Sequence, residues 1–450
     1  MKTANLLSRL LFVLPIFGLS ATAFAQQGQP IAGYKLLSTI AIPGGFRAND
    51  ISWIDSSSAR LYLADRGDAT ASPPVLPRID IFDTENRQFL TSITVSAATD
   101  GVVAVPRSHE VWVGLADSTV IVLNTDTNTI AHVISTGGKG RADEMAYDPA
   151  DRLILIANDK DSPPFVSLIS TQSYSVVKSV AFNGSSAPQA TNGIELPVWD
   201  GPAGKFYISI PATKTNPNGE VDEMDPQTAI VTRSFPTVCK SPKGMVLAPG
   251  QRLVLSCGDV IDILSGNVVT TINGVGGDEV WYNPGDQRIY FGGGTDNITV
   301  NVVDANSYAL LTSLVVGQNL AAPAVSATTK SVTVDAGNNQ IFVPVTGVGA
   351  GVGVQVWRNG ATFTALPNPI PAGGSIVGTA LITWNAPNAQ AVEVHVGSPG
   401  GPLFARAGNR GSQFTGPWVS EGMVFYLQDI TGGLPVTSAN TIATLTVHLQ

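Results

Sequence analysis

Residues 111–124, VWVGLADSTVIVLN, contain a pattern that recurs along the chain. Two short apolar segments rich in valine flank a polar turn, which is typical of two neighbouring antiparallel strands. The first segment has six counterparts elsewhere in the sequence. They read LYLAD (61–65), LILIAN (153–158), FYISI (206–210), LVLSC (253–257), IYFGG (289–293) and IFVPV (341–345). The chain is therefore built from seven copies of one strand-rich unit.

Each copy also has an apolar segment before the quoted one and another after it, as in IDIFDTENRQFLTSI, which starts at Ile79. Repeats of roughly 45 residues with four strands each predict a β-propeller. The seventh copy ends early, near residue 357, whereas residues 34–42, YKLLSTIAI, precede the first copy and have the character of a fourth strand. We predict an all-β chain whose residues 34–359 form a seven-bladed β-propeller, closed by this N-terminal strand.

The composition agrees with a turn-rich β protein. The 450 residues include 46 Gly and 30 Pro, and only 13% are charged. A disordered chain needs more charge and fewer apolar residues, so that class is excluded. Gly and Pro are the residues that turns between short strands require. Helical patterns are nearly absent.

The N-terminus has the features of a secretory signal peptide. Lys2 and Arg9 precede an apolar run at residues 10–19, and a small-x-small cleavage site ends at Ala25. We therefore predict that residues 1–25 are a signal peptide and that the mature protein is periplasmic or secreted. No other apolar run approaches the ~20 residues of a membrane-spanning helix. The net charge of −9 argues against nucleic-acid binding.

The two cysteines, Cys239 and Cys257, flank a strand, a Pro-Gly turn at residues 249–250 and a second strand. Such a hairpin brings the two cysteines opposite each other, within the ~5.5–6 Å between Cα atoms that a disulfide needs. Two cysteines in an exported protein usually form one disulfide. We predict a structural disulfide.

The repeat stops after Asn359, and a proline-rich segment leads to a different module. Residues 373–450 contain short alternating strands with frequent turns, which predicts a small β-sandwich. Residues 383–412, TWNAPNAQAVEVHVGSPGGPLFARAGNRGS, resemble fibronectin type III-like modules. The resemblance implies an Ig/fibronectin-III-like fold with a binding or spacing role. We expect Trp384 in its core, and Trp418 is a candidate for stacking on a carbohydrate.

Aligning the first strands of the seven repeats by their shared endings places one polar column in register. The column consists of Asn49, Asp100, Asp143, Glu195, Lys243, Asp278 and Lys330. The first strand of each blade lines the channel of a propeller, so we expect a polar ring near one mouth of the channel. One interpretation is a ligand or cation site, since carboxylate and amide oxygens suit Ca²⁺. The other is a solvated mouth whose charges pair with one another, and the two lysines favour this second interpretation.

Three segments carry a family resemblance: ADEMAYDPADRLILIAND (142–159), NGIELPVWDGPAGKFYISIP (192–211) and GGDEVWYNPGDQRIYFGG (276–293). They are similar to YVTN-type seven-bladed propellers, a group that includes quinoprotein-like and haem-containing nitrite-reductase-like propellers. The resemblance covers residues 34–358 and implies the fold but no particular activity.

Two functions remain open at this point. The sequence has no CxxCH haem-attachment motif, no GxSxG nucleophile elbow and no HExxH zinc motif. One hypothesis is an exported binding protein that uses its channel or its C-terminal module for a small molecule, a glycan or a protein partner. The alternative is a hydrolase similar to the calcium-dependent gluconolactonase and paraoxonase propellers, with Ca²⁺ at the axis.

Overall fold

The computed structural model describes residues 34–284, 286–294, 298–317, 327–338, 340–347, 351–371, 373–386, 389–437 and 440–450. The predicted signal peptide, residues 1–25, lies outside the described residues. Within these ranges the chain is almost entirely β-structure, and the one helical element is a 3₁₀ turn at Thr431–Gly433. No helix in the described part has the length and apolar character needed to cross a membrane.

Six antiparallel sheets follow one another along the chain, each with four strands in sequence order. The first contains β2 (Asn49–Asp55), β3 (Arg60–Asp65), β4 (Arg78–Asp83) and β5 (Gln88–Thr94). The second contains β6 (Thr99–Val105), β7 (Glu110–Leu115), β8 (Thr119–Asn124) and β9 (Thr129–Ser135). The third contains β10 (Met145–Asp148), β11 (Leu153–Asn158), β12 (Phe165–Ser170) and β13 (Ser175–Ala181).

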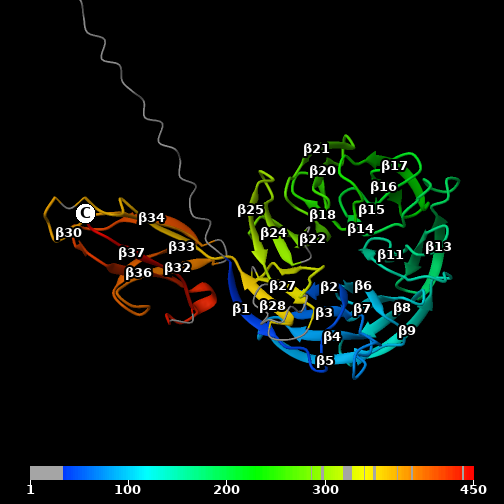
Figure 1. Ribbon diagram of the computed structural model, residues 1–450, viewed down its shortest axis with the longest axis horizontal. Helices are drawn as coiled ribbons and strands as arrows, with labels where there is room; N and C mark the ends of the chain where they lie inside the picture. The colour runs from blue at the N-terminus through cyan, green and yellow to red at the C-terminus, as the bar shows by residue number, and fades with distance from the viewer. Residues whose placement is uncertain are drawn as a thin grey trace, which may run out of the picture. The chain divides into compact units, whose positions relative to one another are not determined.

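The fourth sheet contains β14 (Pro197–Asp200), β15 (Lys205–Ile210), β16 (Glu220–Asp225) and β17 (Ile230–Pro236). The fifth contains β18 (Met245–Ala248), β19 (Arg252–Leu255), β20 (Asp259–Asp262) and β21 (Asn267–Thr271). The sixth contains β22 (Gly277–Asn283), β23 (Arg288–Gly293), β24 (Thr299–Asp304) and β25 (Leu310–Val315). This arrangement of sheets, visible in Figure 1, is propeller-like.

A further four-stranded sheet joins the two ends of the repeated part. It contains β1 (Lys35–Ile40), β28 (Gly353–Arg358), β27 (Gln340–Val345) and β26 (Thr333–Asp335), in this spatial order. The segment predicted to supply an outer strand contains β1. This strand pairs antiparallel with β28, from Lys35 opposite Arg358 to Ile40 opposite Val354.

The sheets pack face to face through buried apolar side chains. One core cluster combines Tyr62 and Ile81 of the first sheet with Val111 and Val113 of the second. Burying a side chain of this kind stabilises the fold by about 1.5–3 kcal/mol. The inner ends of the sheets approach still more closely: a Cβ atom on Gly101 would lie 2.0 Å from the carbonyl oxygen of Asp143. Only glycine fits there, so the polar residues before β10 lie directly beside β6.

The predicted disulfide is confirmed. Cys239 and Cys257 are bonded, with 5.7 Å between their Cα atoms. Next to it, the carboxylate of Asp259 accepts hydrogen bonds from the backbone N–H groups of Val238 and Cys239, at 2.6 and 2.9 Å. The disulfide and this carboxylate together fix the loop that leads into β18.

The C-terminal part forms separate antiparallel sheets. One contains β29 (Thr362–Leu366), β31 (Leu381–Asn385) and β34 (Arg410–Phe414), and a two-stranded one pairs β30 (Val377–Gly378) with β35 (Val419–Ser420). The larger one has the order β33 (Leu403–Gly408), β32 (Ala391–Val396), β36 (Met423–Asp429) and β37 (Thr441–Val447). Trp384 is buried in their shared core, as expected. The structure adds β29, which lies in the segment that the sequence suggested was a linker.

Candidate functional site

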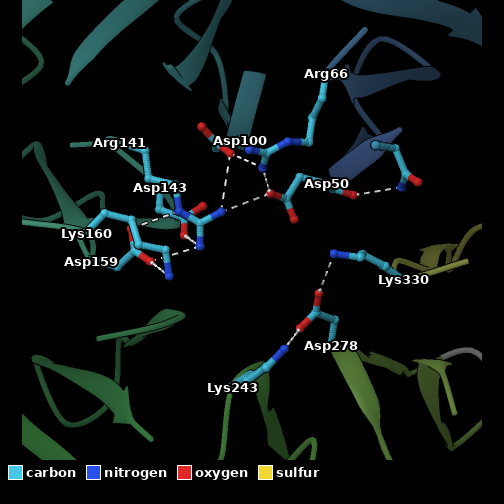
Figure 2. Close-up of polar contacts among 11 residues, drawn as sticks. Asp50, Arg66, Asp100, Arg141, Asp143, Asp159, Lys160, Lys243, Asp278 and Lys330 are labelled. Atoms are coloured by element: carbon cyan, nitrogen blue, oxygen red, sulfur yellow. Dashed lines mark hydrogen bonds and ion pairs between the residues drawn. The ribbon is translucent and has the colours of Figure 1, made fainter. Parts of the chain in front are cut away.

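Three residues of the polar site lie at β-bulges in the inner strands. The strand register shifts between Asn49 and Ser52 in β2, and equivalent shifts occur in β6 and β22. Asp50, Asp100 and Asp278 lie at these three bulges. A β-bulge re-aims a side chain relative to a regular strand. Figure 2 shows Asp50 and Asp100 in one polar network and Asp278 in a separate group with two lysines.

Two arginines join the aspartates of the first three sheets (Figure 2). Arg66 contacts Asp50 at 2.5 Å and also pairs with Asp100. Arg141 binds Asp143 at 2.6 Å and lies 3.5–3.6 Å from the carboxylates of Asp50 and Asp100. Ion pairs at these distances hold residues from three sheets in one geometry, because both guanidinium groups can bind several oxygens in a fixed plane.

Asp159 anchors Arg141 from the other side. Its two oxygens accept hydrogen bonds from Nε and Nη2 of Arg141, at 2.8 and 2.9 Å. Lys160 pairs with the same carboxylate at 2.8 Å. The bidentate contact fixes the plane of the Arg141 guanidinium, so this arginine is a structural centre of the network.

Asp278 belongs to a second, smaller cluster. Its carboxylate contacts the ammonium of Lys243 at 2.7 Å and that of Lys330 at 3.8 Å. Burial lowers the pKa of Lys243, but the neighbouring Asp278 charge and hydrogen bond raise it more, so the net shift is upward. With two ammonium groups and one carboxylate, this side of the ring is positive, whereas the arginine network carries an excess of acids.

Several buried carboxyl groups in this region have raised pKa values. Burial raises the pKa of Glu144, and the nearby Glu279 adds to the shift. Burial and the Asp278 charge raise the pKa of Glu279, whereas a hydrogen bond with Glu144 lowers it. Burial also raises the pKa of Asp143, with the Asp50 charge adding to the shift. The pKa of Glu195 is raised to about 7, by burial and by the nearby Asp159 and Asp278 charges. These groups hold protons at a pH where ordinary carboxyls are ionised.

The structure brings together most of the predicted ring but differs at Asn49. The side chain of Asn49 donates a hydrogen bond to the backbone carbonyl of Asp50, and the Asp50 carboxylate takes part in the ion network instead. Counted back from the strand ends at Asp55 and Val105, Asp50 and Asp100 occupy equivalent positions, so the predicted column was one residue out of register in the first repeat. The prediction also missed Arg66 and Arg141, which lie in loops outside the aligned column.

The carboxylates of the ring do not suit a calcium ion in this arrangement. Oxygens of Asp50, Asp100 and Asp143 lie within 4.8 Å of one another, and so do those of Asp143, Glu144 and Glu195. Ca²⁺ requires several oxygen ligands free to turn toward it. Here Arg66 and Arg141 already bind carboxylate oxygens of the first set. Asp143 belongs to both sets, so its contact with Arg141 occupies a carboxylate of the second set as well.

The inner strands also enclose an apolar cavity of about 1030 Å³. Its lining extends from Ile51 and Glu279, close to the buried acids, to Pro106 and Pro149 at the turns that follow β6 and β10. The cavity therefore occupies the end of the inner strands opposite the polar ring. A volume of this size lies at the upper end of ordinary small-molecule sites.

Five aromatic side chains line the cavity. Trp53, Tyr147, Trp199 and Trp281 come from four inner strands, and Tyr174 comes from the turn before β13. The rings of Trp53 and Trp281 meet edge to face, with 5.1 Å between centroids. None of these residues was assigned to a site from the sequence. The recurrence of Trp or Tyr near the end of the first strand was the available signal for an aromatic-lined site.

Comparison with known proteins adds no assignment, since no protein-family model and no curated protein matches this chain.

Proposed function

We propose that this chain is an exported, closed seven-bladed β-propeller of the YVTN type that binds a small molecule in its channel, followed by a fibronectin type III-like module. The repeated four-stranded sheets and the pairing of β1 with β28 support a closed ring. The contact of β2 with β26 also supports it. The disulfide supports a destination in the periplasm or outside the cell, since disulfides persist in oxidising compartments.

The observation that carries the proposal is the cavity of about 1030 Å³ with aromatic side chains from four inner strands. Trp53, Tyr147, Trp199 and Trp281 are only partly buried, so their faces are accessible from the cavity. Aromatic and aliphatic walls with few polar groups are the usual composition of ligand sites. A ligand that covers these rings removes apolar surface from water, which is the main source of affinity in such sites.

The test uses a neutral apolar dye, N-phenyl-1-naphthylamine, whose fluorescence rises in apolar surroundings. Val198 lines the cavity, and Val198→Trp fills part of it. Val177→Trp makes the same change on β13, where the side chain is 55% exposed, and serves as the matched control. We expect dye binding that weakens about tenfold or more in Val198→Trp and is unchanged in Val177→Trp.

A second readout is independent of the dye. Three of the seven tryptophans, Trp53, Trp199 and Trp281, line the cavity, so an occupant alters the intrinsic fluorescence. Should Val198→Trp fold poorly, Val198→Phe makes a smaller change of the same kind. Equal dye affinity in the wild type and in a folded cavity-filling variant would refute a ligand site in this cavity.

The C-terminal module is a less favoured binding site. Trp418 is 40% exposed, but its ring packs against Phe404 and Phe425, with centroids 5.9 and 6.0 Å away. A stacking platform for a sugar needs an open aromatic face, and two neighbours restrict this one. We therefore assign binding to the channel.

Calcium-dependent hydrolysis is the second candidate. It is favoured only by the two sets of three acidic residues whose carboxylate oxygens lie within 4.8 Å of one another in each set. Metal analysis of the purified protein, followed by ester and lactone hydrolysis with and without a chelator, separates the two candidates. Stoichiometric calcium with chelator-sensitive turnover would establish the hydrolase and reject a purely binding role.

A further inference from the structure

The cavity has an uneven distribution of charge along its length. Among its described lining residues, the side chains that can carry a full charge at neutral pH are Arg107, Arg152, Glu110 and Glu279. Glu279 lies at the inner end, next to the buried acids, and the other three lie toward the turns that follow the inner strands. The wall between the two ends is apolar and aromatic.

The two arginines come from equivalent turns of neighbouring sheets. Arg107 lies between β6 and β7, and Arg152 lies between β10 and β11. Both have a left-handed backbone conformation, with φ of +68° and +56°. A non-glycine residue rarely adopts this conformation outside a fixed turn. The turns therefore hold both guanidinium groups at the same end of the cavity.

Neither guanidinium forms an ion pair or a side-chain hydrogen bond within the described part of the protein. By contrast, Arg66, Arg78 and Arg141 each bind one or more carboxylates. The positive charge of Arg152 acts on the hydroxyl of Tyr147, which places it beside an aromatic wall of the cavity. Two uncompensated arginines at the mouth stand out in a chain whose net charge is −9.

Glu110 forms no ion pair with Arg107 or Arg152 among the described residues. One of its oxygens accepts a hydrogen bond from the hydroxyl of Tyr174 at 2.6 Å, and the other accepts one from Nε1 of Trp112 at 3.1 Å. The bond to this carboxylate raises the pKa of Tyr174 to about 12. Both oxygens of Glu110 are thus committed to partners on its own side of the cavity.

The inner end contributes little charge. Burial raises the pKa of Glu279, so this carboxyl favours its neutral, protonated form more than an ordinary carboxyl does. The inner end of the cavity is therefore better suited to the apolar end of a ligand than to a cationic head group.

On this basis we infer that the channel ligand is an anionic amphiphile, whose apolar body lies along the aromatic wall and whose carboxylate or similar acidic group lies at the mouth beside Arg107 and Arg152. The inference rests on the proposed channel-binding function and specifies the ligand class. Arginine suits this role because its planar guanidinium binds an acidic group through two parallel hydrogen bonds.

Three probes with the same chain length test the inference: dodecanoate, dodecanol and dodecyltrimethylammonium, each below its micelle concentration. Binding is measured by isothermal titration calorimetry and by tryptophan fluorescence. A hydrogen-bonded charge pair predicts that dodecanoate binds about tenfold or more tightly than dodecanol. In the double variant Arg107→Gln/Arg152→Gln, we expect dodecanoate to fall to the affinity of dodecanol, whose own binding stays unchanged.

Arg87→Gln is the matched control. Arg87 also lies in a strand-connecting turn with positive φ, at +53°, but does not line the cavity. Equal binding of dodecanoate and dodecanol, preference for the cationic probe, or unchanged dodecanoate binding in the double variant would each overturn the anionic ligand class. Those results leave channel binding intact if the neutral dye still enters the cavity. Failure of the dye as well would refute the proposed function itself.

Discussion

Asp100 makes the stability of this protein depend on pH in a direction opposite to that of most ion-paired carboxylates. Its pKa is raised from 3.8 to about 7, because burial and the charge of Asp50 raise it more than the charges of Arg66 and Arg141 lower it. The folded state therefore binds the Asp100 proton more tightly than the unfolded state. Its contribution to stability is complete below pH 3.8 and is lost as the pH rises through about 7.

The size of the effect follows from the difference between the two pKa values. A difference of about 3 corresponds to roughly 4 kcal/mol of unfolding free energy at ~1.4 kcal/mol per pKa unit. Asp100→Asn removes the titration with almost no change of shape. We expect the variant to lose this part of the slope between pH 4 and pH 8, while Glu144, Glu195 and Glu279 still titrate in both proteins.

The assay is urea unfolding followed by tryptophan fluorescence at half-unit pH steps from 4 to 8. The quantity compared is the difference in unfolding free energy between variant and wild type at each pH. Asp151→Asn, on the exposed turn before β11, is the matched control and should give a constant difference. Parallel stability curves for Asp100→Asn and the wild type would refute the argument that Asp100 retains its proton in the folded state.

Three further predictions concern stability. Arg141→Gln leaves several carboxylates without their shared partner. The variant should lower the unfolding free energy by about 3 kcal/mol or more in urea titrations at pH 8, with a smaller loss at pH 5. An equal loss at both pH values contradicts the network. The Cys239→Ser/Cys257→Ser variant, which opens an 18-residue separation, should lose about 3 kcal/mol by the same assay, and an unchanged midpoint contradicts a stabilising disulfide. Tyr290→Phe removes the 2.9 Å hydrogen bond to Tyr34, and should lower the melting temperature and speed proteolysis near β1; unchanged cleavage contradicts a role in holding this strand.

The strand content of this chain was predictable because its signals are local. Apolar alternation inside segments such as residues 111–115, and polar turn residues between them, require only neighbouring positions to be read. The disulfide was predictable for the same reason, since both cysteines flank one hairpin. Strand β29 was missed because the prolines that follow residues 362–366 favour a linker interpretation, whereas pairing with β31 holds the segment extended.

The site was less predictable because it depends on bulges and loops. Asp50 enters the ion network in place of Asn49, because the predicted column was displaced by one residue in the first repeat. Arg66 and Arg141 come from loops whose course depends on packing between sheets. The aromatic cavity had a visible signal, the recurrence of Trp or Tyr at Trp53, Tyr147 and equivalent positions. Its meaning became clear only when the strands were placed side by side.

The pairing of β1 with β28 also determines when the protein can finish folding. Lys35 pairs with Arg358, so β1, which precedes the other described strands in the chain, has no partner until nearly the whole repeated region has been synthesised. Contacts between such distant residues form slowly because closing a long loop costs entropy. Before then, β1 presents an open strand edge that can pair with other chains. A chain that ends ahead of Gly353 keeps β1 without this partner permanently, so quality control of newly made chains has a simple structural criterion to act on.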